Sequence, residues 1–163
     1  MTRSAEFDEA TLFTVGTVGQ PGNRLFLLQG GDGLDTLTLK MEKTQVIALS
    51  RGLVTALADL SRPHELPGEA PINTDLDPEW VAGSIEIAID ADAETIAVLI
   101  KELSEEEPAH ARFVITKEQA AQFAIVATRL VEQGRPPCPL CGYPLDPAEH
   151  SCPRTNGHRA PSL

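Results

Sequence analysis

The chain has 163 residues and a net charge of −11, with 42% hydrophobic and only 4% aromatic residues. No apolar run approaches the length of a membrane span, and residues 1–8 are polar and acidic, unlike an export signal. Residues 1–133 carry ten Lys/Arg against twenty-two Asp/Glu, a net charge of −12, which argues against sequence-independent binding of nucleic acid. The scarcity of aromatic residues also argues against a base-stacking surface. We therefore expect a cytoplasmic protein with one packed core and a small appendage.

The first half of the body predicts three strands and a helix. Apolar and β-branched residues favour strands at 12–18 and 25–29, and Gly30-Gly31-Asp32-Gly33 is typical of a hairpin turn. Residues 37–41 alternate between apolar and polar, which is the period of a half-buried strand. A helix follows, with apolar residues recurring at helical spacing at Val46, Leu49, Leu53 and Leu57.

The second half predicts the same order of elements. Isoleucines at alternate positions from Ile85 to Ile89 indicate a strand. A second strand is expected at 95–103, although 101–103 also fit a helix, and a third at 113–115. Thr116 is placed to cap a helix whose apolar positions are Ala120, Phe123, Ala127, Leu130 and Val131.

The two halves match at a constant offset of 74 residues, which indicates an internal repeat. Residues 42–45 align with 116–119, so that Lys43 falls on Lys117 and Gln45 on Gln119. Apolar positions upstream also coincide without a gap, as Phe26 does with Ile100. The alternative is a chance match, because the identity between the halves is low.

These elements predict an α+β fold in which two βββα-like repeats form an antiparallel sheet covered by two helices. The repeat units are expected at about 6–62 and 80–134 within a duplicated domain at 1–134, joined by a proline-rich linker at 63–79. A small zinc-ribbon-like module follows at 135–163.

The C-terminal segment holds all three cysteines of the chain in zinc-knuckle spacing. Cys138 and Cys141 form a Cys-x-x-Cys pair, Cys152 is the third ligand, and either His150 or His158 completes a tetrahedral structural Zn²⁺ site. His150 is preferred because it lies beside Cys152. A redox pair would need a helix that the surrounding prolines oppose, and a disulfide would suit an exported chain.

A polar run follows the last cysteine and is a candidate contact for an anion or a partner. Its arginines could bind a phosphate or a carboxylate, and the alternative is a solvated tail. The run comprises Arg154, Asn156, His158 and Arg159.

Other polar residues of the body have simpler structural explanations. Asp90, Asp92 and Glu94 have the spacing of early calcium ligands, but the remainder of a calcium loop is missing, which favours a solvated hairpin turn. His64 and His110 lie in predicted loops and are interpreted as facing solvent. No cluster of nucleophile, base and acid can be assembled from the sequence.

The tail string resembles the ending of a family of uncharacterised actinobacterial repeat proteins. It reads Cys138-Pro139-Leu140-Cys141-Gly142, Leu145-Asp146-Pro147 and His150-Ser151-Cys152-Pro153-Arg154-Thr155-Asn156-Gly157. The segments 13–16 and 39–45 fit the same family. The resemblance implies a cytoplasmic protein of unknown function with no established catalytic residues. It also implies partners, because genes for a phosphatidylinositol-kinase-like and a histidine-phosphatase-like protein tend to lie beside those of the family.

The sequence leads to three hypotheses of function. The first is a non-catalytic, zinc-containing module that binds another cytoplasmic protein, in line with the lack of catalytic motifs. The second is an enzyme or accessory subunit acting on a phosphorylated small molecule, motivated by the arginines of the tail and the implied gene neighbours. The third, a nucleic-acid binder through the zinc tail, is disfavoured by the acidic body. The oligomeric state does not follow from the sequence.

Overall fold

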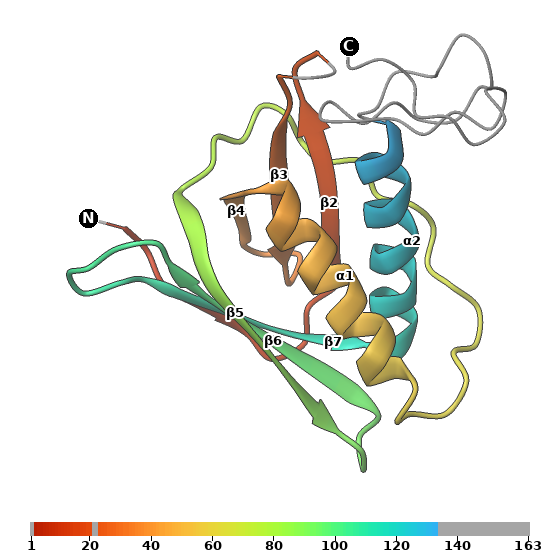
Figure 1. Cartoon of the computed structure of the whole chain (residues 1–163). Helices are drawn as coiled ribbons and strands as arrows, with labels where there is room; N and C mark the ends of the chain where they lie inside the picture. The colour runs from red at the N-terminus through yellow and green to blue at the C-terminus, as the bar shows by residue number, and fades with distance from the viewer. Residues whose placement is uncertain (1, 21–22, 134–163) are drawn as a thin grey trace, which may run out of the picture.

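The computed structural model describes residues 2–20 and 23–133, which form an α+β fold with one seven-stranded sheet and two helices (Figure 1). The predicted strands and helices are confirmed, and one short strand, β1, is additional. The elements are β1 (Ala5–Phe7), β2 (Leu12–Val18), β3 (Leu25–Gly31), β4 (Thr36–Met41), α1 (Lys43–Leu57), β5 (Trp80–Asp90), β6 (Thr95–Glu102), β7 (His110–Thr116) and α2 (Lys117–Gln133).

The sheet has the order β1-β7-β6-β5-β4-β3-β2. The sequence predicts an antiparallel sheet, and this prediction is wrong for two of the strand pairings. Two hairpin-linked meanders, β2-β3-β4 and β5-β6-β7, are antiparallel inside. They join through a parallel pairing of β4 with β5, and β1 pairs parallel with β7. The parallel pairing of β4 with β5 follows from helix α1 between them, because a parallel pair needs a long crossover connection, usually a helix.

The two edge strands are consecutive in the chain, so the sheet must curl. β1 and β2 are joined by residues 8–11 only. Within this link, the Ala10 N–H donates to Val114 O of β7 (3.1 Å) and the Thr11 N–H donates to Gly31 O of β3 (2.8 Å). The link therefore runs from one edge of the sheet to the other and holds the two edges together.

The interior of the curl is packed with phenylalanines. The Phe113 ring of β7 lies 5.4 Å from Phe7 and 5.3 Å from Phe13, centroid to centroid, and Phe13 lies 4.7 Å from Phe123 of α2. Phe113 also fills the place that a side chain on Gly30 of β3 would occupy. These contacts connect both edges of the sheet to one helix.

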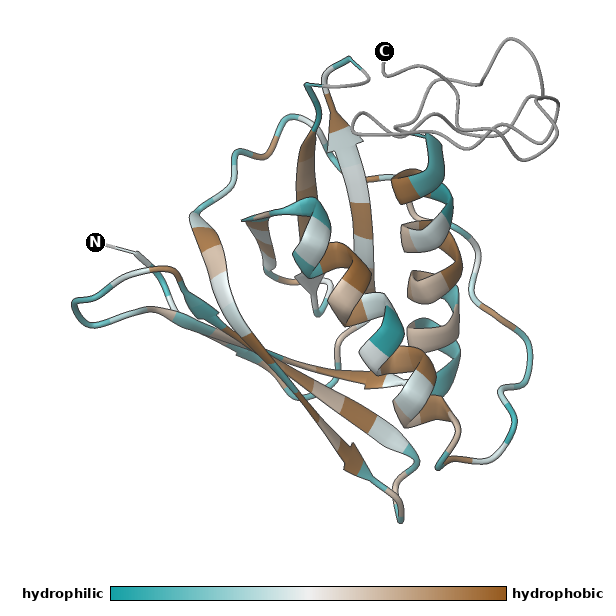
Figure 2. Ribbon diagram, viewed as in Figure 1, coloured by the Kyte–Doolittle hydropathy of each residue, from teal (hydrophilic) through white to brown (hydrophobic). Residues whose placement is uncertain are grey.

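The two helices lie side by side over one face of the sheet, and each buries an apolar stripe (Figure 1). Leu49 and Leu53 of α1, with Phe123 and Ala127 of α2, are almost completely buried. Hydrophilic residues gather instead at the hairpin tips and loops (Figure 2). None of the helices in residues 2–20 and 23–133 is long and apolar enough to cross a membrane.

Each helix has a glutamine in its first turn that hydrogen-bonds to the neighbouring parallel strand or to its extension. Gln45 accepts a hydrogen bond from the Glu42 N–H (2.8 Å) and donates to the carbonyls of Ala82 (2.9 Å) and Gly83 (2.8 Å) at a bulge in β5. Gln119 accepts from the Thr116 N–H (2.8 Å) and donates to the Ala10 carbonyl (2.8 Å). The glutamines that align in the sequence thus make the same contacts.

The constant offset of 74 residues describes the helices and the strands before them, but it is wrong for β3 and β6. Phe26 lies opposite Met41, and Ile96 lies opposite Ile115. With Met41 aligned to Ile115, Phe26 therefore corresponds to Ile96 rather than to Ile100. The hairpin loops differ in length between the two halves, and an ungapped alignment cannot accommodate this.

The segment 63–79 is irregular and crosses the outer face of β2 and β3. Thr14 donates to the Ala70 carbonyl (2.9 Å), and Gln29 exchanges two hydrogen bonds of 2.8 Å with the backbone of Asn73. Ile72 packs where Gly16 has no side chain. The linker therefore shields a sheet face that no helix covers.

Candidate functional site

The residues that the sequence predicts as a site lie outside the described residues. They are the zinc ligands Cys138, Cys141, His150 and Cys152, and the contact residues Arg154, Asn156, His158 and Arg159. Within residues 2–20 and 23–133, no group of three or more His, Cys, Asp or Glu is placed to hold a metal ion. The site described below is therefore built from other residues.

The acidic turn after β5 is a hairpin turn, as predicted. The Asp90 carboxylate accepts hydrogen bonds from the backbone N–H groups of Asp92 and Ala93, both at 3.1 Å. The prediction that His110 lies in a loop was wrong, because it begins β7, whereas its side chain does face solvent, with 42% of it exposed. Its ring contacts Glu6 at 3.4 Å on the exposed edge of the sheet.

Glu94, at the end of that turn, belongs to a cluster that we call the α2 ion-pair cluster: Lys117, Glu94 and Ser61. Lys117, the first residue of α2, is 5% exposed, and its ammonium donates to Glu94 (2.9 Å) and to the Ser61 hydroxyl (2.5 Å). Hydrogen bonds from the Ser61 side chain, and then from Lys117 and the Ser61 backbone, lower the pKa of Glu94 to about 2. The buried cation thus has a carboxylate of its own.

Three further cations of the body are also paired with acids. They are Arg3 with Asp35 (2.5 Å) and Glu79 (2.8 Å), Arg112 with Asp8 (2.8 Å), and Arg129 with Glu69 (2.6 Å). With Lys117, these are the four Lys and Arg that form ion pairs within residues 2–20 and 23–133, and the other six there form none.

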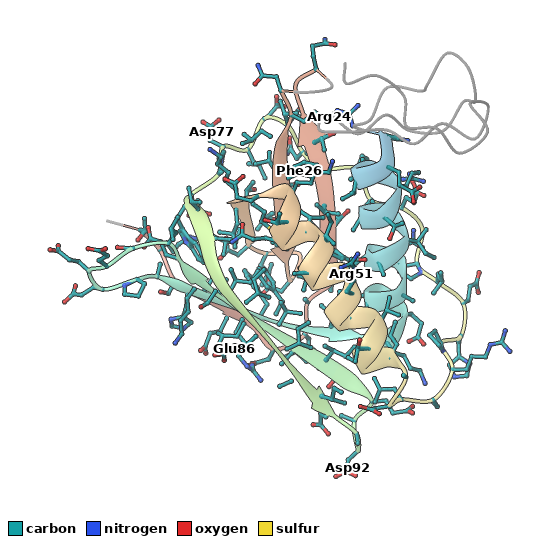
Figure 3. The ribbon with its side chains drawn as sticks, in the orientation of Figure 1. Arg24, Phe26, Arg51, Asp77, Glu86 and Asp92 are labelled. Carbon is teal, nitrogen blue, oxygen red and sulfur yellow. The ribbon has the colours of Figure 1, made fainter. Side chains whose placement is uncertain are left out.

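Three cations that have no ion pair within the described ranges gather around one cavity at the start of α1. We call Arg24, Lys40 and Lys43 the α1 basic site. They line an open cavity of about 580 Å³, together with Asn23, Leu25, Phe26, Met41 and Glu42. Figure 3 shows Arg24 at the end of the molecule where the β2–β3 hairpin lies.

The guanidinium of Arg24 is the least satisfied polar group of this site. Its Nε and Nη1 atoms are buried and have no hydrogen-bond partner in the part of the chain that the structure describes. Arg24 precedes β3 directly, and Lys43 follows β4 by two residues. The pairing of Phe26 with Met41 brings these two segments together.

The electrostatics of the α1 basic site favour an anion. Three cations face one carboxylate, Glu42, so the side chains lining the cavity carry a net charge of +2. The N-terminus of α1 adds the positive end of a helix dipole. A guanidinium and two ammonium groups can supply the charge-assisted hydrogen bonds that bind phosphates and carboxylates.

Two smaller cavities offer less chemistry. One of about 260 Å³ lies between the helices and is lined by Arg51 and Glu132 among others, and one of about 60 Å³ lies beside Phe13.

Sequence reasoning missed the α1 basic site because its cations span twenty residues of chain. The alignment of Lys43 with Lys117 could have revealed the site, because it raises the question of which residue pairs with each lysine.

Comparison with known families gives one result, and it covers most of the chain. A family model described as a protein of unknown function (DUF3090) matches residues 5–152. Neither the curated proteins nor the solved structures gave a match. The matched segment includes the described α+β body and ends at Cys152, the last predicted zinc ligand. The chain therefore belongs to the DUF3090 family of proteins of unknown function.

Proposed function

We propose that this chain is a non-catalytic, zinc-containing accessory protein of the cytoplasm that binds an anionic group of another molecule in the α1 basic site. The observation that carries the proposal is the Arg24 guanidinium, two of whose nitrogens are buried without a partner among the described residues. A buried donor without an acceptor costs about 1–3 kcal/mol, and more when it is charged. A bound anion would remove that cost.

The composition of the cavity favours binding over catalysis. Among the described residues that line it, Glu42 is the only carboxylate, and no histidine, cysteine, serine or threonine is present to act as a base or nucleophile. The acidic body disfavours nucleic acid as the anion, because a net charge of −12 repels a long polyanion. A single anionic group bound in the cavity is compatible with both the cationic lining of the cavity and the negative charge of the body.

The zinc tail enters the proposal as a second binding element. Three thiolates and one imidazole, from Cys138, Cys141, Cys152 and His150, form a closed ligand set that suits structural zinc. The family segment extends through all four positions. The zinc would hold the residues that follow, including Arg154 and Arg159, for contact with the same partner.

The test is purification of the tagged full chain from its own host without chelator, followed by native mass spectrometry. We expect one zinc per chain and a stoichiometric bound molecule. Lys43→Glu should lose that molecule, whereas Lys101→Glu makes the same charge change on an exposed strand position away from the cavity and should retain it. Retention by both variants would refute the role of the α1 basic site, and a chain without zinc would refute the zinc proposal.

A further inference from the structure

The two βββα units place different residues at one equivalent position, and this difference points to a ligand. Lys43 and Lys117 each follow the last strand of their unit by two residues, counted from Met41 and Ile115. The residues opposite these two strand positions are Phe26 and Ile96. Two residues before Phe26 stands Arg24, and two residues before Ile96 stands Glu94. Arg24 therefore occupies the place in the first unit that Glu94 occupies in the second.

The consequence is an ion pair in one unit and two like charges in the other. In the α2 ion-pair cluster, Lys117 binds the Glu94 carboxylate at 2.9 Å. In the α1 basic site, Lys43 lines a cavity with Arg24 and Lys40, and no described acid forms an ion pair with any of the three. The first unit thus has the same lysine, but a second cation stands where the second unit has its carboxylate.

We infer that the α1 basic site is a receptor for a dianionic phosphate group carried by a small molecule, an inference that rests on the proposed function. Charge complementarity selects this ligand class. The lining side chains carry a net charge of +2, and a phosphate monoester carries about −1.5 to −2 at neutral pH. One carboxylate would leave half of that charge uncompensated.

The size and surroundings of the cavity agree with a small molecule. Its volume of about 580 Å³ lies within the range of about 300–1,000 Å³ that small-molecule sites occupy. It is open, so the phosphate can enter while the rest of the ligand remains outside. The acidic body beyond the cavity favours one terminal phosphate over a chain of phosphodiesters.

The experiment is isothermal titration calorimetry of the full-length protein with four probes: inorganic phosphate, phenyl phosphate, dimethyl phosphate and acetate. We expect binding of the first two, and at least tenfold weaker binding of the diester and of acetate. Tighter binding of phenyl phosphate than of inorganic phosphate would identify an ester as the ligand, and the reverse order would identify free phosphate.

Arg24→Glu is the informative variant, because it places a carboxylate in the α1 basic site at the position where the α2 ion-pair cluster has Glu94. It should bind phosphate at least tenfold more weakly than the wild type, yet melt at an equal or higher temperature in phosphate-free buffer. Lys101→Glu should bind within twofold of the wild type. Arg24→Gln, which removes the charge and keeps much of the shape, should also lose at least tenfold and serves if Arg24→Glu does not fold.

The outcomes distinguish a failure of the phosphate inference from a failure of the proposed anion-binding function. Acetate binding as tight as phosphate would overturn the phosphate inference and leave the anion-binding function intact. Wild-type protein that binds none of the four probes would overturn both. If both Arg24→Glu and Arg24→Gln bind phosphate as the wild type does, then phosphate binds elsewhere on the protein, and the assignment to the α1 basic site is overturned.

Discussion

The curl of the sheet rests on the contact between Phe113 and Gly30, and a double-mutant cycle can measure it. A methyl group on Gly30 would lie 2.7 Å from Phe113 Cδ1 and closer still to Cε1, so the ring would have to move. The ring is fully buried and held between Phe7 and Phe13. Because it has no free direction, Gly30→Ala should cost about 2–3 kcal/mol, the upper part of the range for overpacking.

Phe113→Ala should cost about 3–5 kcal/mol, since it removes a buried ring and leaves a cavity. In the double variant the new methyl group enters that cavity, so Gly30→Ala should add almost nothing to the effect of Phe113→Ala. The coupling free energy is therefore about 2–3 kcal/mol, within the range seen for residues in contact. Urea unfolding of the four proteins measures it.

Gly52→Ala supplies the control for this cycle. Its added methyl group would meet Ile87 rather than Phe113, so its effect should add to that of Phe113→Ala within about 0.5 kcal/mol. Additive effects of Gly30→Ala and Phe113→Ala would refute the reasoning. β3 and β7 would then not meet across the interior, and the sheet would not be curled as described.

Three further predictions concern acid stability, the first helix and zinc. The pKa of Glu94 is lowered from 4.5 to about 2, so its contribution to stability is present above pH 4.5 and is lost as the pH falls towards 2. Glu94→Gln should therefore weaken the decline of the melting temperature between these pH values, and an unchanged decline would contradict the role of Glu94. Gln45→Ala removes two hydrogen bonds to β5 and should lower the free energy of unfolding by about 1–3 kcal/mol in urea titrations, whereas a neutral effect would show that the helix needs no such fastening. Cys141→Ser should reduce the zinc content measured by atomic emission from one per chain to below half while leaving the far-UV spectrum of the body intact, and full zinc retention would exclude Cys141 as a ligand.

Local patterns in the sequence were sufficient to predict most of the elements. The alternation at 37–41 and the helical spacing from Val46 to Leu57 depend on neighbours in the chain, and the structure confirms both. The strand Ala5–Phe7 was missed because three residues carry too little periodicity, and it exists through its pairing with β7. Likewise, the parallel pairing of β4 with β5 depends on the path of the chain through α1 and the linker, and no local residue pattern indicates that path.

The candidate site could not be predicted for the same physical reason. Arg24 and Lys43 become neighbours only through the pairing of Phe26 with Met41, which the sequence does not state. The ungapped alignment hid their relation to the second unit as well, because it placed Phe26 on Ile100 instead of Ile96. An alignment by strand pairing was needed to show that Arg24 stands where Glu94 does.

The reciprocal substitution Glu94→Arg tests whether that equivalence has physical meaning. It would leave Lys117, which is 5% exposed, beside a second cation and without its carboxylate, as Lys43 is in the first unit. In phosphate-free buffer the variant should melt at a lower temperature than the wild type, because a buried ammonium loses its partner. Added phosphate should then raise the melting temperature of the variant more than that of the wild type, because a second phosphate-sized anion site has been created. Circular dichroism with and without phosphate follows both effects, including refolding if the variant is unfolded at first. A variant as stable as the wild type, or one whose melting temperature phosphate raises no more than that of the wild type, would show that the residue at this position does not decide whether its lysine needs an external anion.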